Sequence, residues 1–324
     1  MRSTVRSSRF ALAPLATVAT LVVGLVAAAP AGAATLAART FLASFGDDAN
    51  SCTTPQDPCR WFNAALDKTE AGGQVSILDG GHYGAPAVGK SITIDGESSG
   101  GAVVRMTLNV TIGDDDIVVL RGLVLGGGFS GDFIRFAGTG TLHVEGCVID
   151  GTNNGHGGLN GLLIEPKGAS RVFVTDTVIR NLLTNDAHAL RLYAPERGPT
   201  VVTLERVRFE HNVSGMTVIA QEGDVERVQI TLRESVIAQH ESHGIEVAGF
   251  QVRGSVDVMV ENTVVAANGR TGVSCGGASA RVRLHNTTVT HNEVGLSGCV
   301  FSYGDNTVDE NDADGTPAGL LNQT

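Results

Sequence analysis

The chain has 324 residues, of which 42% are hydrophobic, and its 34 acidic residues outnumber its 23 basic ones. This balance excludes a nucleic-acid-binding role, which depends on a basic surface that neutralises phosphates. It also disfavours polyanionic uronates as ligands, unless a cation or a local arginine patch intervenes.

Residues 1–33 have the pattern of an export signal. Three arginines precede an apolar run over residues 10–29, and Ala31-Gly32-Ala33 provides the small residues of a cleavage site. The run approaches the length of a membrane span, so an uncleaved anchor is the competing interpretation. Cleavage would leave 20 basic and 34 acidic residues, a formal net charge of −14. We therefore expect a secreted or periplasmic protein with no membrane contact after cleavage.

Residues 34–73 are expected to form an N-terminal segment with a disulfide loop and a short helix. The helix is predicted between residues 60 and 70, where apolar residues recur with helical spacing until Gly72-Gly73 ends the pattern. The residues of this stripe are Phe62, Ala65 and Leu66. Because a repetitive region follows, whose first coil would otherwise expose its apolar interior, we expect this helix to act as a cap.

Residues 74–311 contain the pattern that decides the fold. Seven times the chain repeats two apolar residues separated by a spacer, then two polar residues, and a third large apolar residue five positions after the second. The second apolar residue of each repeat is its anchor, and successive anchors stand 24 to 30 residues apart. The anchors are Leu120, Val144, Val174, Leu204, Leu232, Val260 and Leu284.

The spacing within each repeat indicates strands joined by corners. Alternation with period two is typical of a strand with one buried face. The alternation shifts by one residue at each polar pair, such as Glu205-Arg206, which indicates a first corner. A few residues later a Gly or Ala, such as Gly215, introduces another apolar strand, which implies a second corner. Three strands and two corners in about 27 residues are too short for a strand-helix-strand unit or a propeller blade, and they indicate stacked coils.

This pattern resembles that of the right-handed parallel β-helix proteins, the pectate-lyase-like superfold of secreted bacterial proteins and polysaccharide-active enzymes. The resemblance covers about residues 74–311 and implies an all-β solenoid of about eight to ten coils with a short N-terminal capping helix. Residues 312–324 are expected to form a flexible tail.

One further position supports the resemblance. Eight residues after four of the anchors stand polar residues that would stack into the polar turn ladder typical of that family. These residues are Asn212, His240, Asn268 and Asn292. The pattern departs at two earlier coils, where Thr152 and Leu182 occupy the same place.

The five cysteines suggest an oxidising compartment. Cys52 and Cys59 bracket a short turn-rich segment and are expected to pair. Cys275 and Cys299 each stand fifteen residues after an anchor, which places them on neighbouring coils about 4.8 Å apart, within the range of a disulfide. Two reduced core cysteines are the alternative for this pair. Cys147 is expected to be a small, buried core residue.

Function has to be argued from a site, because this fold hosts lyases, hydrolases, epimerases, binding modules and adhesins. Ser242-His243-Gly244 and Gly155-His156-Gly157 resemble the histidine motif of polygalacturonases, but the paired aspartates of that family are missing. Lyases of this fold need a Lys or Arg base near a calcium-binding carboxylate cluster. None of the three lysines, Lys68, Lys90 and Lys167, stands on an apolar-flanked strand beside acids.

One row of polar residues remains as a candidate site. Each member stands directly before the Gly or Ala that introduces the later apolar strand of a coil, namely Asn160, His188, Ser214, His243 and Thr271. Asp186 and Glu241 precede the two histidines by two residues. Such a row can bind a sugar chain or, after side-chain convergence, a metal. The alternative is a polar turn ladder without a ligand.

The function predicted from the sequence is non-catalytic binding of a glycan or a cell surface by an exported β-helix protein. A polysaccharide lyase or epimerase is the enzymatic alternative, and a structural or adhesive surface protein is the third. No cofactor, bound metal or nucleic-acid partner is expected. Aromatic residues make up only 5% of the chain and are mostly Phe, which argues weakly against a sugar-stacking platform.

Overall fold

A computed structural model describes residues 36–127, 131–152, 160–184, 186–195, 197–220, 226–249 and 254–322, together with residues 1, 3 and 4. The chain divides into two units, Met1–Thr35 and Leu36–Thr324. The apolar run of the predicted signal lies outside the described residues. Within the described residues, no helix is both long and apolar enough to span a membrane.

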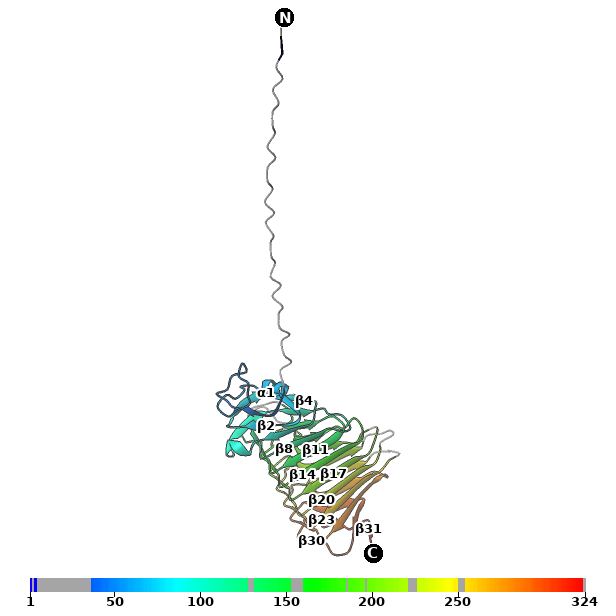
Figure 1. The fold of residues 1–324 in the computed structure, drawn as a ribbon. Helices are drawn as coiled ribbons and strands as arrows, with labels where there is room; N and C mark the ends of the chain where they lie inside the picture. Colours follow the sequence, from blue (N-terminus) through cyan, green and yellow to red (C-terminus); the bar gives the residue numbers. More distant parts are fainter. Residues whose placement is uncertain are drawn as a thin grey trace. The chain divides into compact units, whose positions relative to one another are not determined.

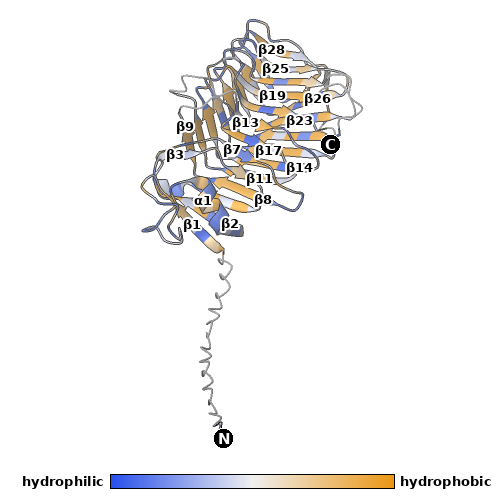
Figure 2. Ribbon diagram, turned by 90° about the horizontal axis from the view of Figure 1, so that it is seen from above, coloured by the Kyte–Doolittle hydropathy of each residue, from blue (hydrophilic) through white to orange (hydrophobic). Residues whose placement is uncertain are grey.

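The second unit is a stack of coils built from three parallel sheets, which Figures 1 and 2 show from two directions. Each coil passes through sheet A, then sheet B, then sheet C, and each new coil adds one strand to each sheet. The described part of the chain contains 12 strands in sheet A, ten in sheet B and nine in sheet C. The nine strands of sheet C agree with the eight to ten coils predicted, and the all-β parallel β-helix is confirmed.

Sheet A consists of β1 (Ala37–Leu42), β2 (Thr69–Ile77), β5 (Ile92–Asp95), β8 (Ile117–Arg121), β11 (Gly140–Glu145), β14 (Ser170–Thr175), β17 (Thr200–Glu205), β20 (Val228–Arg233), β23 (Val256–Glu261), β26 (Ala280–His285), β29 (Val300–Ser302) and β31 (Gly319–Leu320). Sheet B consists of β3 (Gly81–Gly84), β6 (Val103–Met106), β9 (Val124–Gly126), β12 (Val148–Asp150), β15 (Val178–Arg180), β18 (Arg208–Glu210), β21 (Val236–Ala238), β24 (Val264–Ala266), β27 (Thr288–Thr290) and β30 (Thr307–Asp309). Sheet C consists of β4 (Ala87–Val88), β7 (Leu108–Val110), β10 (Ile134–Phe136), β13 (Asn160–Ile164), β16 (His188–Tyr193), β19 (Ser214–Ala220), β22 (Ile245–Gly249), β25 (Thr271–Gly276) and β28 (Val294–Gly298).

The anchors line the core of the stack. The seven anchor residues pair in register along sheet A, from Leu120 with Val144 to Val260 with Leu284. Each anchor, the apolar residue two positions before it and the one five positions after it are at most 2% exposed. The alternation of apolar and polar residues along the strands is visible in Figure 2. Burial of these side chains is the main stabilising term of the fold.

Two residues with positive φ shape the corners of a typical coil. The first stands two positions after the anchor, and its φ lies between 44° and 59°. These residues are Gly122, Gly146, Asp176, Arg206, Glu234, Asn262 and Asn286. The second stands seven positions after the anchor in six coils, at Gly127, Asn181, His211, Gln239, Ala267 and His291. The polar pair in the sequence therefore marks a left-handed residue that turns the chain from sheet A into sheet B.

The predicted polar ladder forms between sheets B and C. Each ladder side chain accepts the backbone N–H of the residue at the same place in the preceding coil, at 2.9 to 3.2 Å. The members are Asn212, His240, Asn268, Asn292 and, one coil beyond the predicted set, Asn311. Buried backbone donors need such partners, so the ladder satisfies one N–H in each of these coils.

The two departures from the ladder pattern have a local cause. The N–H of Thr152 donates to Oδ1 of Asp150 within its own corner, at 2.9 Å. The N–H of Thr152 therefore needs no acceptor from the next coil, so the apolar Leu182 is tolerated at the ladder position of that coil. Leu182 itself donates its N–H to Asn212, where the ladder begins.

The ends of the stack carry the helix and additional strands. Helix α1 (Phe62–Lys68) lies within the predicted range, buries Phe62 and Ala65, and packs on β1 and β2. A short 3₁₀ helix covers Glu97–Ser99. Sheet A extends beyond the range 74–311 that was expected for the solenoid, because β1 pairs with β2 and β31 pairs with β29.

Both predicted disulfides are present. Cys52 and Cys59 pair with their Cα atoms 5.1 Å apart, and Cys275 and Cys299 join neighbouring coils with a Cα separation of 4.9 Å. Cys147 is free and buried, as predicted. Burial raises the pKa of its thiol to about 11, so this cysteine stays protonated at neutral pH and is a core residue.

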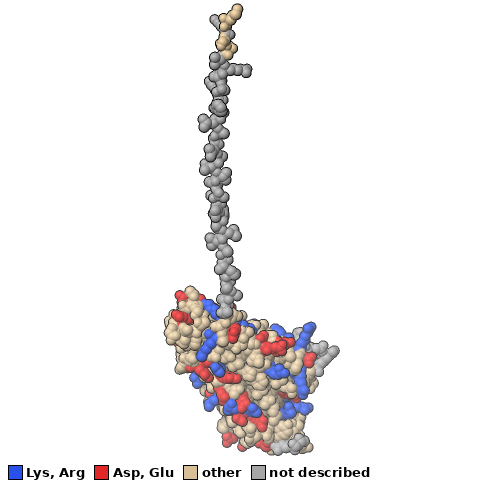
Figure 3. Space-filling model, viewed as in Figure 1, with Lys and Arg blue, Asp and Glu red and all other residues tan. Residues whose placement is uncertain are grey.

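Charged side chains of both signs are intermixed on the face of the molecule shown in Figure 3. Pairs between coils account for part of this pattern. Arg206 contacts Asp176 at 2.7 Å, and Arg233 pairs with Glu205. Each of these exposed ion pairs contributes little to stability. The stacking of coils accounts for them, and they do not indicate a binding site.

Candidate functional site

The predicted row of polar residues lies together along sheet C. Asn160, His188 and Ser214 are register partners on β13, β16 and β19. His243 and Thr271 continue the row on the next two coils, where their carbonyl oxygens accept N–H groups from the preceding coil at 2.9 and 3.0 Å. These five residues therefore lie on successive coils of the stack.

The small residue after each member of the row explains where the row faces. A Cβ atom at Gly215 would lie 2.7 Å from Nε2 of His240 and 2.8 Å from Cγ2 of Ile237, so this position faces the filled interior. The preceding residue in the strand points to the opposite side. The polar row is thus on the outer face of sheet C, although Asn160, His188 and Ser214 are only 3 to 4% exposed.

The row begins one coil earlier than the sequence analysis predicted. Asp132 stands two residues before Ile134 of β10, as Asn160 stands two residues before Leu162 of β13, and Ile134 and Leu162 are register partners. The Asn160 amide donates to Oδ1 of Asp132 at 2.7 Å. Burial raises the pKa of the Asp132 carboxyl, and the nearby negative charge of Glu165 adds to this effect.

A second outward row, which the sequence analysis missed, runs beside the first. Its members are mostly polar and pair in register across seven strands of sheet C. They are Asn109, Arg135, Leu163, Arg191, Thr217, Glu246 and Ser274. The inward-facing residues beside them are apolar in every coil, so the sequence pattern reveals them. The outward row changes residue type from coil to coil, so no repeat in the sequence marks it.

His188 connects the two rows. Its Nδ1 lies 3.0 Å from the Thr217 hydroxyl, and its Nε2 lies 3.4 Å from Oδ1 of Asp186 without the geometry of a hydrogen bond. The other carboxylate oxygen of Asp186 accepts a hydrogen bond from Arg191 at 3.0 Å. Burial lowers the pKa of His188, the charge of Arg191 lowers it further, and Asp186 and Glu246 oppose this shift. The imidazole is therefore neutral at pH 7.

The outer face of sheet C concentrates unsatisfied polar atoms. In the part of the chain that the structure describes, eight buried side-chain nitrogen or oxygen atoms have no hydrogen-bond partner, and four of them lie on this face. They are Oδ1 of Asn160, Nε2 of His188, Nε of Arg191 and Nδ1 of His243. Such atoms each cost about 1–3 kcal/mol. The Asn212 ladder leaves one such atom, Nε2 of His240, whereas the outer face of sheet C gathers four, so among the described residues this face holds the larger group of unmet hydrogen-bonding atoms.

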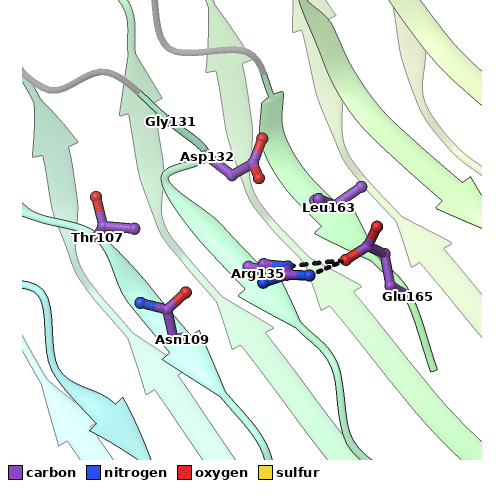
Figure 4. Close-up of a pocket in the computed structure, with 7 residues that line it drawn as sticks. All are labelled: Thr107, Asn109, Gly131, Asp132, Arg135, Leu163 and Glu165. Atoms are coloured by element: carbon purple, nitrogen blue, oxygen red, sulfur yellow. Dashed lines mark hydrogen bonds and ion pairs between the residues drawn. The ribbon is translucent and has the colours of Figure 1, made fainter. Parts of the chain in front are cut away.

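A pocket of about 340 Å³ lies at the N-terminal part of the same face (Figure 4). Its lining comes from β7, β10, β13 and the residues beside them, namely Thr107, Asn109, Gly131, Asp132, Arg135, Leu163 and Glu165. Arg135 donates to one oxygen of Glu165 through Nε at 2.8 Å and Nη2 at 2.6 Å. The pocket therefore combines two carboxyl groups, one paired guanidinium group and one apolar wall.

Other predicted candidates do not join the site. Glu241 is exposed, and among the described residues no hydrogen bond or ion pair connects it to His243. The segment Gly155-His156-Gly157 lies outside the described residues. No group of three or more His, Cys, Asp or Glu side chains in the described ranges is arranged to hold a metal ion.

Two of the three lysines have structural roles. Lys68 donates to the carbonyl oxygens of Asp48 and Asn50 beside the Cys52–Cys59 loop. Lys90 donates to the carbonyl oxygens of Leu66 and Thr69 at the end of α1. Neither side chain reaches the outer face of sheet C, since both ammonium groups bind carbonyl oxygens at the N-terminal end of the β-helix.

The sequence matches no protein-family model and no curated protein. Among solved structures, pectate lyase Pel9A is similar with a TM-score of 0.53 and 15% identity, over 83% of this chain and 72% of that chain. The chain has the pectate-lyase-like β-helix fold. A rhamnogalacturonan lyase aligns with a TM-score of 0.45 and 12% identity, over 78% of this chain and 74% of that chain. A GH136 lacto-N-biosidase from Eubacterium ramulus gives a TM-score of 0.39 and 10% identity, over 88% and 67%. At 15% identity, the similarity to pectate lyase Pel9A concerns the fold alone.

Proposed function

We propose that this β-helix protein acts outside the cytoplasm and binds a neutral glycan on the outer face of sheet C without cleaving it. The observation that carries the proposal is the group of four unsatisfied polar atoms on this face. The group includes an acceptor, Oδ1 of Asn160, and a donor, Nε of Arg191. A hydroxyl group both donates and accepts, so a ligand rich in hydroxyl groups can satisfy every member of the set.

Access to the row depends on Asp186. The side chain of Asp186 is 72% exposed and lies over Nε2 of His188, whereas the His188 side chain is 4% exposed. Rotation of this exposed carboxylate toward solvent opens Nε2 and releases Arg191 to a ligand. Asp186 is the exposed partner of the pair, whereas Arg191 is partly buried, and exposed side chains change rotamer rapidly, so the carboxylate can turn away without any change in the packing of His188.

The charges of the face favour a neutral ligand. Arg135 is paired with Glu165, so a uronate would have to displace that carboxylate. Beside Arg191 and His188 it would meet the exposed carboxylate of Asp186, which repels it. The chain also has a formal net charge of −11, which repels polyanions. A neutral polysaccharide meets neither obstacle.

The same pairing supports binding rather than elimination chemistry. Abstraction of a proton from a sugar requires a basic group in its deprotonated state. Arg135 and Arg191, two guanidinium groups on this face, each contact a carboxylate, so neither is held ready to take a proton from a sugar. The two disulfides support an extracellular location, because such bonds persist in oxidising compartments.

Isothermal titration of the disulfide-bonded protein against soluble neutral glycans tests the proposal. The panel comprises β-glucan, galactan, mannan and xylan, with polygalacturonate as the anionic comparison. We expect one or more neutral glycans to bind, and His188→Gln combined with Arg191→Gln to weaken binding at least tenfold. Glutamine is preferable to alanine because His188 is buried and its removal would leave a cavity.

A matched control exchanges the same residue types on another sheet. His143→Gln with Arg171→Gln alters the outer face of sheet A, where these residues lie on β11 and β14, and should leave binding unchanged. Equal binding by both double variants, or by polygalacturonate alone, would refute the proposal. Release of unsaturated or epimerised sugars would replace it with the lyase or epimerase alternative.

A further inference from the structure

The pocket in Figure 4 lies at one end of the outer face of sheet C. It is lined from three consecutive strands, β7, β10 and β13. Only the two-residue strand β4 precedes them in the sheet. The two polar rows continue from the pocket in the other direction, toward β16 and later strands. A chain-like ligand on these rows therefore comes to an end at the pocket.

One wall of the pocket is apolar although its position in the strand is outward. Leu163 pairs in register with Arg135 on one side and Arg191 on the other, yet it is only 7% exposed. Opposite this wall stand the polar side chains of Thr107 and Asn109. A pocket with one apolar and one polar side matches a sugar ring, which presents C–H groups on its faces and hydroxyl groups at its edge.

The charged groups of the pocket disfavour an acidic sugar. Arg135 is engaged with Glu165 through two of its nitrogen atoms, which fixes the guanidinium plane. Asp132 accepts the amide of Asn160, and burial raises the pKa of its carboxyl. A further carboxylate would meet two carboxyl groups and no free cation among the residues that line the pocket.

We propose that this pocket is an end subsite that holds one uncharged terminal hexose of the bound glycan, a step that rests on the function proposed above. The volume of about 340 Å³ is at the lower end of small-molecule sites, which suits one sugar residue better than an oligosaccharide. The terminal ring packs a C–H face on Leu163, and its hydroxyl groups contact Asn109, Asp132 and the Arg135–Glu165 pair. The remaining sugars extend over Arg191 and His188.

Ligand-observed NMR with methyl glycosides of glucose, galactose and mannose tests this subsite separately from the polymer. We expect one of these methyl glycosides to bind with a Kd of about 1 mM, the affinity that a ligand of this size typically reaches. Galacturonic acid should bind at least tenfold more weakly. Asn109→Ala with Asp132→Asn should weaken methyl glycoside binding at least tenfold, and Asn109→Trp should abolish it by filling the pocket.

The double variant His188→Gln with Arg191→Gln is the matched comparison. It should retain methyl glycoside binding while it loses polymer binding, because its substitutions lie outside the pocket. If the polymer binds the native protein but no methyl glycoside does, the end subsite is refuted and the proposed function stands. If methyl glycosides bind the pocket variants as well as the native protein, the subsite is likewise refuted. If neither polymer nor methyl glycoside binds, both proposals fail.

Discussion

His240 is the one imidazole in a ladder otherwise built from asparagine. Its ring atom Nδ1 accepts the backbone N–H of Asn212, and so takes the place of an asparagine side-chain oxygen in this coil. The backbone N–H of His240 in turn donates to Oδ1 of Asn268. Its second nitrogen, Nε2, is buried without a partner. Burial lowers the pKa of this histidine to about 4, from an ordinary value near 6.5. The folded protein therefore holds His240 neutral over a range in which the unfolded chain protonates it.

This difference predicts a specific loss of stability in mild acid. The pKa of His240 is lower in the folded protein than in the unfolded chain. Its contribution to the free energy of unfolding is therefore highest above pH 6.5 and falls as the pH falls toward 4, because the unfolded chain binds the proton more readily. A shift of this size corresponds to about 3 kcal/mol at most. Urea unfolding between pH 8 and pH 4 should show a smaller fall in the free energy of unfolding for His240→Asn than for the native protein.

The comparison with the variant isolates His240 from His188, whose pKa burial also lowers. Asparagine at position 240 can accept the Asn212 N–H as the other ladder residues accept theirs, so the variant should fold. At pH 8 its stability should lie within about 1 kcal/mol of the native value, since the ladder bond is kept. An identical pH dependence in both proteins would contradict this account of the ladder histidine.

At the scale of elements, the corners repeat one backbone conformation with different residues. In six coils the residue seven positions after the anchor has positive φ, and Ala267 with φ 56° is the member least suited to it. Alanine lacks the polar side chain that makes this region accessible to Asn or His, and it carries a Cβ atom that clashes there. The corner between β24 and β25 therefore contains local strain.

Ala267→Gly should relieve that strain. We expect the free energy of unfolding to rise by about 0.5–1 kcal/mol, because glycine adopts positive φ without a steric penalty. Ala266→Gly, one residue earlier in β24, has no positive φ to relieve and should lower stability by a similar amount. Thermal and urea unfolding of the two variants measure the effect. A decrease in both variants would show that the corner is not strained.

The elements of the core were predictable because one physical requirement recurs in every coil. Apolar side chains must fill the same interior positions, so Leu120, Val144 and their counterparts repeat at fixed offsets from the corners. The ladder was also predictable, since each coil has one buried N–H at the same place. Asn311 was missed because the next anchor-like repeat is absent from the sequence, although it extends the same row.

The outer face was predictable only in part. Solvent imposes no common residue type on outward positions, so Arg135, Arg191 and Thr217 differ from coil to coil and carry no period. Asp132 could have been found, because it stands at the same offset as Asn160. The usual Gly or Ala after it is replaced by Phe133, which removed the signal used to identify the row.

At the scale of the whole β-helix, each described strand pairs only with the strands of the coils before and after it. Stability is then approximately a sum of terms within coils and between neighbouring coils. The two disulfides act at opposite ends of the stack. Cys52–Cys59 closes the loop beside α1, and Cys275–Cys299 joins the coils of β25 and β28. Removing either crosslink should therefore weaken one end more than the other.

The paired substitution Cys275→Ser and Cys299→Ser tests this local coupling. It opens a crosslink with a sequence separation of 24 residues, which should lower stability by about 3 kcal/mol. Hydrogen exchange followed by mass spectrometry should show faster exchange in β26 to β31, while β2 to β8 keep their protection.

The reciprocal variant, Cys52→Ser with Cys59→Ser, should reverse the pattern. Exchange should rise in β1 and α1, and the fluorescence of Trp61, the single tryptophan of the chain, should report earlier unfolding of the cap. The C-terminal coils should keep their native protection, because among the described strands none of theirs pairs with β1 or β2. A uniform loss of protection along the stack in either variant would mean that the solenoid unfolds as one cooperative unit, and that neighbour-to-neighbour coupling exceeds the stability of a single coil.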